Sequence, residues 1–176
     1  SITPGGHIKS LYKPFYVLSI ATVLNGEYTM QRLDGSHYQE KKFIAPEASI
    51  LVVDDNVMNL KVVEGLLRPY KIKVFVATSG EECLKKLDVS RYDIIFMDHM
   101  MPEMDGVEAL NLLRSDASNP NRKCIVIALT ANAIAGCRET YLEYGFNDYF
   151  SKPVQADKLD ELLLQYLPKQ LIQIVT

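Results

Sequence analysis

The sequence predicts an α/β protein with a doubly wound five-stranded parallel sheet and an N-terminal helical extension. One observation is that short apolar runs alternate with helix-length segments from residue 49 onward, as in a parallel sheet covered by helices. The other is that the runs 93–98 and 124–130 are apolar at almost every consecutive position. Strands covered by helices on both faces have this composition, whereas strands with one face in water alternate apolar and polar residues.

Each predicted strand is a short apolar run that ends at or next to a polar residue. The strands are 50–54, 74–77, 93–98, 124–130 and 148–150. The segments between and after them carry apolar residues three or four positions apart, which is helical spacing. The predicted helices are 57–69, 79–87, 106–114, 133–144 and 155–167. Strands that alternate with helices in this way are joined by crossovers and therefore run parallel.

Local signals indicate where several helices begin and end. Asn56 is the expected N-cap of the first helix, and Ser79 with Glu82 has the spacing of a capping box at the second. Gly145 follows the fourth helix as a C′ glycine, and Pro168 ends the last helix. The expected buried face of the first helix is Val57, Leu60, Val63 and Leu67. The apolar side of the last helix is Leu159, Leu162, Leu163, Tyr166 and Leu167.

The composition limits the classes of function. The 176 residues carry a formal net charge of −3 and are 48% hydrophobic and 23% charged, which is normal for a globular protein. Because the chain lacks a basic stripe and an apolar stretch of roughly 18 residues, we expect no nucleic-acid binding and no membrane contact by this segment. The cysteines show no metal-ligand spacing, so we expect reduced thiols and a cytoplasmic location, although a membrane-anchored parent protein is left open. They are Cys83, Cys124 and Cys137.

Polar residues whose side chains can bind ligands or react stand at or near the ends of four predicted strands. Asp54 and Asp55 close the first strand, Asp98 closes the third, and Thr130 closes the fourth. Lys152 lies two residues after the fifth strand, directly before Pro153. Ligands of parallel α/β sheets bind outside the carboxyl ends of the strands. We therefore expect these side chains to converge. Three carboxylates, a hydroxyl and an ammonium in one crevice suit a divalent cation together with a phosphoryl group.

Four segments that contain these residues resemble the receiver domains of two-component signalling. They are 51–56, 97–106, 128–133 and 148–153. They occur in the family's order and at its spacing, so the resemblance covers roughly residues 49–168. It implies the (βα)5 flavodoxin-like receiver fold. The sequence around Asp54-Asp55-Asn56 further resembles receivers that are appended to sensor histidine kinases.

The resemblance implies a role for each acid. Asp98 corresponds to the phosphoacceptor, whose carboxylate forms an acyl phosphate. Asp54, Asp55, Asp98 and the backbone carbonyl of Met100 would hold Mg²⁺ or Mn²⁺, with Asp54 acting largely through water. Because a backbone atom supplies the last ligand, an apolar side chain at Met100 is compatible with the site.

The resemblance also implies a switch. Lys152 would pair with a phosphoryl oxygen, aimed by a cis bond to Pro153, and Thr130 would hydrogen-bond another phosphoryl oxygen. The inward movement of Thr130 would then change the rotamer of Tyr149 on the fifth strand. The surface read by partners would be formed by 133–144, 148–150 and 155–167. Within the first of these helices, an apolar stripe could serve as core or as interface; it consists of Ile134, Cys137, Tyr141 and Tyr144.

We expect three parts in the chain: an extension and linker over 1–48, a receiver over 49–168 and a tail over 169–176. Within the extension, Lys13-Pro14 and the apolar residues after it repeat the pattern around Lys152-Pro153. One interpretation is that 11–26 is the last strand end and helix of a preceding receiver-like domain. A short amphipathic leader helix is the alternative.

The predicted function is a receiver that takes a phosphoryl group from a phosphohistidine onto Asp98 with Mg²⁺ and switches a signalling surface. Its partner would be a histidine kinase or a phosphotransfer domain, in the context of a hybrid histidine kinase. The domain would not be a conventional enzyme, since it modifies itself. Two alternatives remain: a binding module that is never phosphorylated, and the receiver of a separate response regulator. The sequence leaves open whether the protein forms a homodimer.

Overall fold

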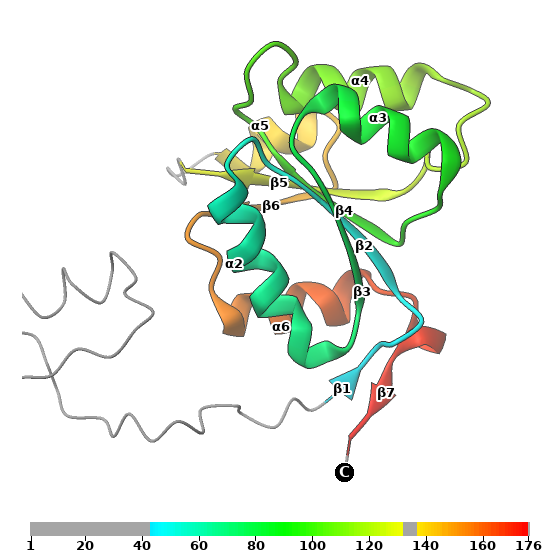
Figure 1. Ribbon diagram of the computed structural model, residues 1–176, viewed down its shortest axis with the longest axis vertical. Helices are drawn as coiled ribbons and strands as arrows, with labels where there is room; N and C mark the ends of the chain where they lie inside the picture. Colours follow the sequence, from blue (N-terminus) through cyan, green and yellow to red (C-terminus); the bar gives the residue numbers. More distant parts are fainter. Residues whose placement is uncertain (1–42, 132–136, 176) are drawn as a thin grey trace, which may run out of the picture. The chain divides into compact units, whose positions relative to one another are not determined.

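Five parallel strands form the central sheet of this computed structural model, which describes residues 43–131 and 137–175 (Figure 1). The strands are β2 (Ser49–Val53), β3 (Lys73–Ala77), β4 (Ile94–Asp98), β5 (Ile125–Thr130) and β6 (Asp148–Ser151). Their order is β3-β2-β4-β5-β6, and every neighbouring pair is parallel. The chain winds from β2 to one edge and then crosses back to β4. The predicted doubly wound sheet is thereby confirmed, and a topological switch point lies between β2 and β4.

The helices cover both faces of this sheet. They are α2 (Val57–Leu67), α3 (Gly80–Val89), α4 (Gly106–Ser115), α5 (Cys137–Glu143) and α6 (Ala156–Tyr166). Figure 1 shows α2 and α6 on one face and α3, α4 and α5 on the other. A 3-10 turn, Arg68–Tyr70, follows α2 directly, and it takes the place of the last residues of the helix predicted over 57–69.

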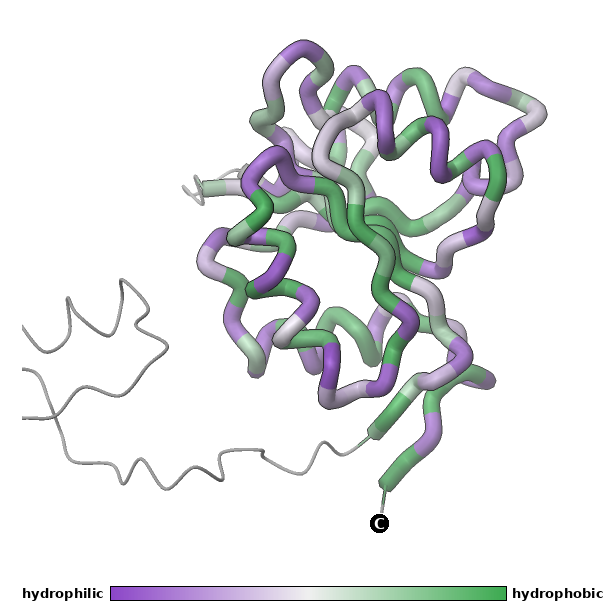
Figure 2. The backbone as a smooth tube through the Cα atoms, viewed as in Figure 1, coloured by the Kyte–Doolittle hydropathy of each residue, from purple (hydrophilic) through white to green (hydrophobic). Residues whose placement is uncertain are grey.

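The strands divide their side chains between two apolar clusters, one under each helix layer. In β4, Ile94 and Phe96 join the cluster of α2 and α6, whereas Ile95 and Met97 join the cluster of α3, α4 and α5. Because successive strand residues point to opposite faces, a run of consecutive apolar residues fills both layers. Figure 2 shows the hydrophobic colour concentrated along the central strands.

The predicted helix caps are observed, with one change at the second helix. The Asn56 side chain accepts a hydrogen bond from the backbone N–H of Met58 at the start of α2. Ser79 accepts one from the N–H of Glu82, but the Glu82 carboxylate accepts from the backbone and hydroxyl of Thr78. A capping box would have returned that carboxylate to the N-cap residue. Gly145 has φ 94° after α5, as the predicted C′ glycine requires.

One residue of the predicted helix face is not buried. Leu60, Val63 and Leu67 of α2 are buried, but the Val57 side chain is 54% exposed. Val57 is the first residue of the helix, so it lies above the carboxyl end of β2, where the sheet provides no further surface to pack against. Helical spacing alone does not reveal where the sheet ends.

Packing extends beyond residues 49–168 at both ends. The short strand β1 (Phe43–Ile44) pairs antiparallel with β7 (Gln173–Ile174), after a 3-10 turn over Lys169–Leu171. The Phe43 side chain is 2% exposed, and its ring centroid lies 5.1 Å from that of Tyr70. The predicted extension up to residue 42, with the strand end and helix expected over 11–26, lies outside the described residues. None of the helices in the described part of the chain is long and apolar enough to cross a membrane.

Candidate functional site

Three carboxylates meet at the carboxyl edge of the sheet. Asp54 and Asp55 follow β2, and Asp98 ends the neighbouring β4. Each offers one oxygen, and these oxygens lie within 4.8 Å of one another. Asp54 and Asp98 are buried, whereas Asp55 is exposed. A cation could therefore enter from solvent on the Asp55 side and meet carboxylate oxygens, the ligands that Mg²⁺ prefers.

Asp54 is held in place by hydrogen bonds at both oxygens. Its Oδ1 accepts from the backbone N–H of Asn56 at 2.9 Å and from Nδ2 of Asn59 at 3.0 Å. Its Oδ2 accepts from Lys152 Nζ at 2.6 Å. Asn59 was not among the predicted site residues. Its position one turn into α2, on the side of the cap residue Asn56, was the signal that could have found it.

Lys152 bridges two of the acids. Its Nζ lies 2.6 Å from Asp54 Oδ2 and 2.8 Å from Asp98 Oδ2. Burial alone would lower the pKa of Lys152, but hydrogen bonds and charge from the two carboxylates outweigh it and raise the pKa. The ammonium therefore stays charged. Its backbone N–H donates to the Thr130 carbonyl at 2.7 Å, and the Lys152–Pro153 peptide bond is cis.

The Asp98 carboxyl is more reluctant to ionise than an ordinary aspartate. Burial is the largest cause of its raised pKa, and the charge of Asp54 adds to it, while Lys152 acts in the opposite direction. Three carboxylates and one ammonium leave a formal charge of −2 in the crevice. A divalent cation would neutralise this charge, so both the charge and the oxygen donors of the site fit Mg²⁺.

Gly106 allows the loop after β4 to fold tightly beneath the site. A Cβ atom at this position would lie only 2.3 Å from the Asp98 carbonyl oxygen. The Gly106 N–H donates to the His99 carbonyl at 3.0 Å, and Asp105 caps α4 by accepting from the N–H of Glu108. The start of α4 thus packs directly on the backbone of Asp98. Met100, between them, is 74% exposed, and its N–H lies 3.4 Å from Asp98 Oδ1.

The two predicted switch residues lie on adjoining strands. Thr130 is buried at the end of β5, and its register partner is Ser151 of β6. Tyr149 is half-buried two residues earlier on β6 and packs against the apolar cluster under α3, α4 and α5. Residues two apart on a strand share a face, so Tyr149 and Ser151 point to the same side of the sheet. Of the stripe predicted in 133–144, Tyr141 is buried and Tyr144 is exposed; Ile134 and the Cys137 side chain lie outside the described part.

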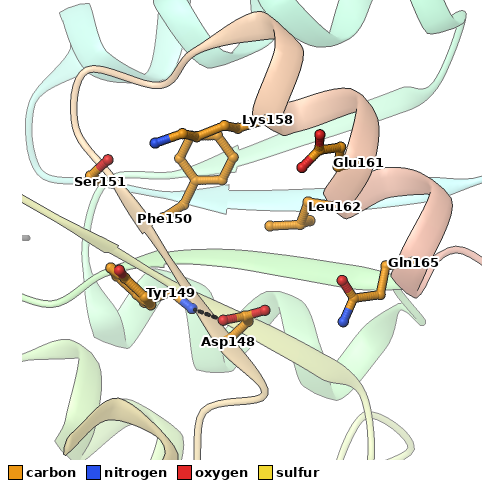
Figure 3. A pocket seen from close by; sticks show the side chains of 8 residues that line it. All are labelled: Asp148, Tyr149, Phe150, Ser151, Lys158, Glu161, Leu162 and Gln165. Carbon is orange, nitrogen blue, oxygen red and sulfur yellow. Dashed lines mark hydrogen bonds between the residues drawn. The ribbon is translucent and has the colours of Figure 1, made fainter. Parts of the chain in front are cut away.

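A pocket of about 240 Å³ lies at the β6 edge of the sheet, apart from the acids. Figure 3 shows it between β6 and α6, with Phe150 and Tyr149 on opposite sides of the strand. Lys158 and Glu161 supply charges along its α6 wall. The pocket thus adjoins Tyr149, and its lining does not include Asp54, Asp55 or Asp98. The pocket and the three clustered acids therefore occupy different places on the molecule.

Comparison with known proteins gives consistent matches. Residues 50–164 match the model of the response regulator receiver domain. The signal transduction histidine-protein kinase BarA of Shigella flexneri is 38% identical over 120 residues, which are 68% of this chain and 13% of the kinase. The chain therefore corresponds to a small part of that relative.

Two solved structures match over nearly their whole length. The receiver domain of the sensor histidine kinase PA1611 from Pseudomonas aeruginosa PAO1 is 37% identical, with a TM-score of 0.61 over 68% of this chain and 96% of that one. A magnesium ion is coordinated in its active site cleft. The receiver domain of Saccharomyces cerevisiae Ssk1, in complex with the histidine phosphotransfer protein Ypd1, is 27% identical with a TM-score of 0.64, over 72% and 93%.

Proposed function

This chain belongs to the response regulator receiver family, and from that premise we propose that Asp98 accepts a phosphoryl group from a phosphohistidine. One observation carries the proposal. The Asp98 carboxylate lies 2.8 Å from the Lys152 ammonium and shares its crevice with the carboxylates of Asp54 and Asp55. The acceptor, a cation-binding pair of acids and a fixed positive charge for the phosphoryl oxygens are therefore side by side.

In the proposed reaction, an Asp98 carboxylate oxygen attacks phosphorus in line with the phosphorus–nitrogen bond of the donor. That bond breaks, its electron pair returns to the imidazole, and an acyl phosphate forms on Asp98. Lys152 gives up its contact with Asp98, forms a new contact with one of the incoming phosphoryl oxygens, and keeps its contact with Asp54. Because Lys152 already stands against Asp98, this exchange needs little movement.

Asp55, Asp98 and the backbone carbonyl of Met100 would hold Mg²⁺ directly, and Asp54 would act largely through water. Support comes from the oxygen donors, from the −2 formal charge and from the magnesium ion in the PA1611 receiver. The cation would neutralise the repulsion between the acceptor and the phosphoryl oxygens. Mn²⁺ has the same charge and accepts the same oxygen ligands, so we expect it to substitute.

The signal would leave the site through Thr130 and Tyr149. Thr130 would hydrogen-bond a phosphoryl oxygen, and Tyr149 would change rotamer as Thr130 moves. The surface formed by α5, β6 and α6 would carry the change to a partner. The pocket beside Tyr149 is part of that surface.

We infer that the donor is a histidine kinase or a phosphotransfer domain and that the chain is part of a hybrid histidine kinase. BarA and the Ypd1–Ssk1 complex support this inference. Apolar side chains exposed at the start of α2 and after Asp98 would contact the donor domain; they are Val57, Met58 and Met100. The absence of nucleic-acid binding and a cytoplasmic location stay predictions from the sequence, and whether the protein forms a homodimer stays open.

Incubation with Mg²⁺ and acetyl phosphate, followed by intact mass, tests the acceptor role. We expect one added phosphoryl group, which disappears when Mg²⁺ is chelated and in Asp98→Asn. The matched control is Glu103→Gln, which removes an exposed carboxylate from the following loop and should still be modified. An unmodified wild-type protein would favour a binding module that works without phosphorylation. Modification that persists in Asp98→Asn would assign the acceptor to another residue.

A further inference from the structure

His99, directly after the proposed acceptor, contributes its side chain to the opposite face of the sheet. Alternation along β4 continues past the end of the strand. Asp98 faces the crevice, whereas His99 reaches α5, where its Nδ1 lies 2.9 Å from the Tyr141 hydroxyl. The two rings are also in edge-to-face contact, with centroids 5.4 Å apart. A polar link thus joins the acceptor strand to a helix of the proposed signalling surface.

Tyr141 continues this link to the proposed switch. Its side chain is 5% exposed, and its ring stacks on Tyr149 with a centroid distance of 6.0 Å and an interplanar angle of 8°. Phe146 packs edge-on against the same ring, with centroids 5.7 Å apart. The Tyr141 ring therefore offers a stacking surface to Tyr149. Its hydroxyl contacts His99, and its ring also packs against Phe146.

The backbone of His99 has little freedom. Its N–H donates to the Leu129 carbonyl of β5, and its carbonyl accepts from the Gly106 N–H at the start of α4, both at 3.0 Å. A displacement of the Asp98 backbone relative to β5 or α4 would disturb these two hydrogen bonds and, through them, the His99 side chain. Energetic coupling between two sites can be carried by packed, hydrogen-bonded groups that have two discrete arrangements.

We propose that His99 and Tyr141 are positioning residues that set the rotamer balance of Tyr149 and couple it to phosphorylation of Asp98. This rests on the proposed function, and it adds a second route beside the one through Thr130. The hydrogen bond fixes the orientation of the Tyr141 ring, and the ring offers Tyr149 a stacking surface in one of its rotamers. When the loop after β4 rearranges, the bond shifts or breaks and the stacked rotamer loses its support.

The test follows the Tyr149 side chain by NMR in the full chain, labelled with tyrosine carrying carbon-13 at its ε positions. The Tyr149 resonance is identified by its loss in Tyr149→Phe. Spectra and intact masses are recorded on the same samples with Mg²⁺, before and after acetyl phosphate. In Tyr141→Phe, which keeps the ring and removes only the hydroxyl, we expect the rotamer ratio of unphosphorylated Tyr149 to change by about fivefold, the size of one net hydrogen bond. The change in the Tyr149 chemical shift on phosphorylation should be smaller than in the wild type for the same reason.

A mutant cycle separates this role from a general loss of packing. His99→Leu removes the hydrogen bond and also the ring contact, whereas Tyr141→Phe removes the bond alone. The two effects should therefore be less than additive in the double variant, because the bond can be lost only once. His99→Asn retains a hydrogen-bonding atom at the Nδ1 position and should restore part of the wild-type behaviour. Tyr144→Phe removes a hydroxyl from the exposed neighbour on the same side of the molecule and is the matched control.

Two results would overturn the proposal: a Tyr149 resonance in Tyr141→Phe that matches the wild type in both states, or additive effects of His99→Leu and Tyr141→Phe. Failure of the proposed function would look different, since the wild-type protein would gain no phosphoryl mass. The unphosphorylated spectra would then still decide whether His99 and Tyr141 hold Tyr149.

Discussion

At the scale of single residues, the three acids of the site differ in their surroundings although they carry the same carboxyl group. Asp54 is buried under two asparagine donors and Lys152, Asp98 is buried with a raised pKa, and Asp55 faces solvent. Burial and hydrogen bonding thus give the three acids different surroundings, which suit the roles proposed for them: Asp54 as an orienting acid, Asp98 as the acceptor and Asp55 as an exposed ligand. Burial makes the ionised form of Asp98 unfavourable, and a measurement of folding stability can detect this cost.

Asp98→Asn should raise the stability of the metal-free protein at neutral pH. A carboxyl whose pKa is higher in the folded state binds more protons there, so folding stability falls as pH rises from the unfolded pKa through the folded pKa. The loss of folding stability is complete at pH values above the folded pKa. It is absent at pH values below the unfolded pKa of about 4, where the carboxyl is protonated in both states. Urea unfolding with a chelator should show the variant above the wild type at pH 7 and a smaller difference at low pH.

Mg²⁺ should reverse that order, because on the proposed ligand set it would bind the folded wild type through Asp98 and stabilise it by mass action. Glu103→Gln, which changes an exposed acid, should follow the wild type throughout. A metal-free Asp98→Asn that is less stable at pH 7 would mean that the ion pair with Lys152 outweighs the cost of burial.

At the scale of elements, the connection from β4 to α4 determines the environment of Asp98, the proposed acceptor. The loop returns so closely that the start of α4 touches the Asp98 backbone, and Gly106 is the residue that permits this contact. The start of α2 has a second role, since its first turn leaves Val57 and Met58 exposed beside the acids. One element therefore shapes the site, and another offers a surface to a donor.

Gly106→Ala should distort the loop, because the new Cβ would lie 2.3 Å from the Asp98 carbonyl oxygen, a backbone atom with little freedom to move. We expect a loss of about 1–3 kcal/mol in the free energy of unfolding, as for overpacked positions, together with slower modification by acetyl phosphate. The matched control is Gly65→Ala in α2, where the added Cβ meets nothing within 4 Å. This control should instead stabilise the helix by roughly 0.5–1 kcal/mol. Equal effects of the two substitutions in urea unfolding would contradict the close approach.

Met58→Lys should distinguish a protein donor from a small one. Met58 is 64% exposed beside the acids, so a donor domain would cover it, whereas acetyl phosphate would not. We expect transfer from a phosphotransfer protein to slow at least about fivefold, as when an interface contact is lost, with the acetyl phosphate rate retained. Leu112→Lys, on the exposed side of α4, is the control. Equal slowing with both donors would mean that the substitution damages the site itself.

At the scale of the whole molecule, the packed unit is larger than the segment that carries the motifs. Phe43 and the pairing of β1 with β7 join residues before the first sheet strand to residues after the last helix. Ala45 and Ala48 are fully buried, and the Ala45 N–H donates to the Tyr70 carbonyl at 2.8 Å. The segment that leads into β2 is therefore part of the folded structure and is more than a spacer.

Phe43→Ala should destabilise the domain by about 3 kcal/mol, since it empties a site lined by Tyr70 and the core under α2 and α6. Phe75→Ala makes the same change on the edge strand β3, where the side chain is 42% exposed, and should cost less than about 1 kcal/mol. Thermal or urea unfolding of both variants in the full chain provides the comparison. A neutral Phe43→Ala would indicate that the 49–168 segment folds without help from the preceding residues.

Most of the sheet was predictable because its signals are local. Consecutive apolar residues, the cap at Asn56 and the glycine at 145 depend on neighbours in sequence, and the structure confirms the elements they predict. The predicted burial of Val57 was wrong, because burial depends on where the sheet ends beneath the helix. His99 was missed because its partner Tyr141 lies 42 residues further along the chain. Asn59 was missed although its partner Asp54 is only five residues away and its place one turn into α2 was a local signal.

The sequence by itself determined the five-stranded α/β fold, the family and the identity of the acids, since strand periodicity and ordered motifs are written along the chain. Only the tertiary structure decided that Lys152 stands between Asp54 and Asp98, that β1 pairs with β7, and that His99 reaches Tyr149 through Tyr141. These contacts join residues far apart in the chain. Their formation depends on the packing of whole layers, which no local pattern encodes.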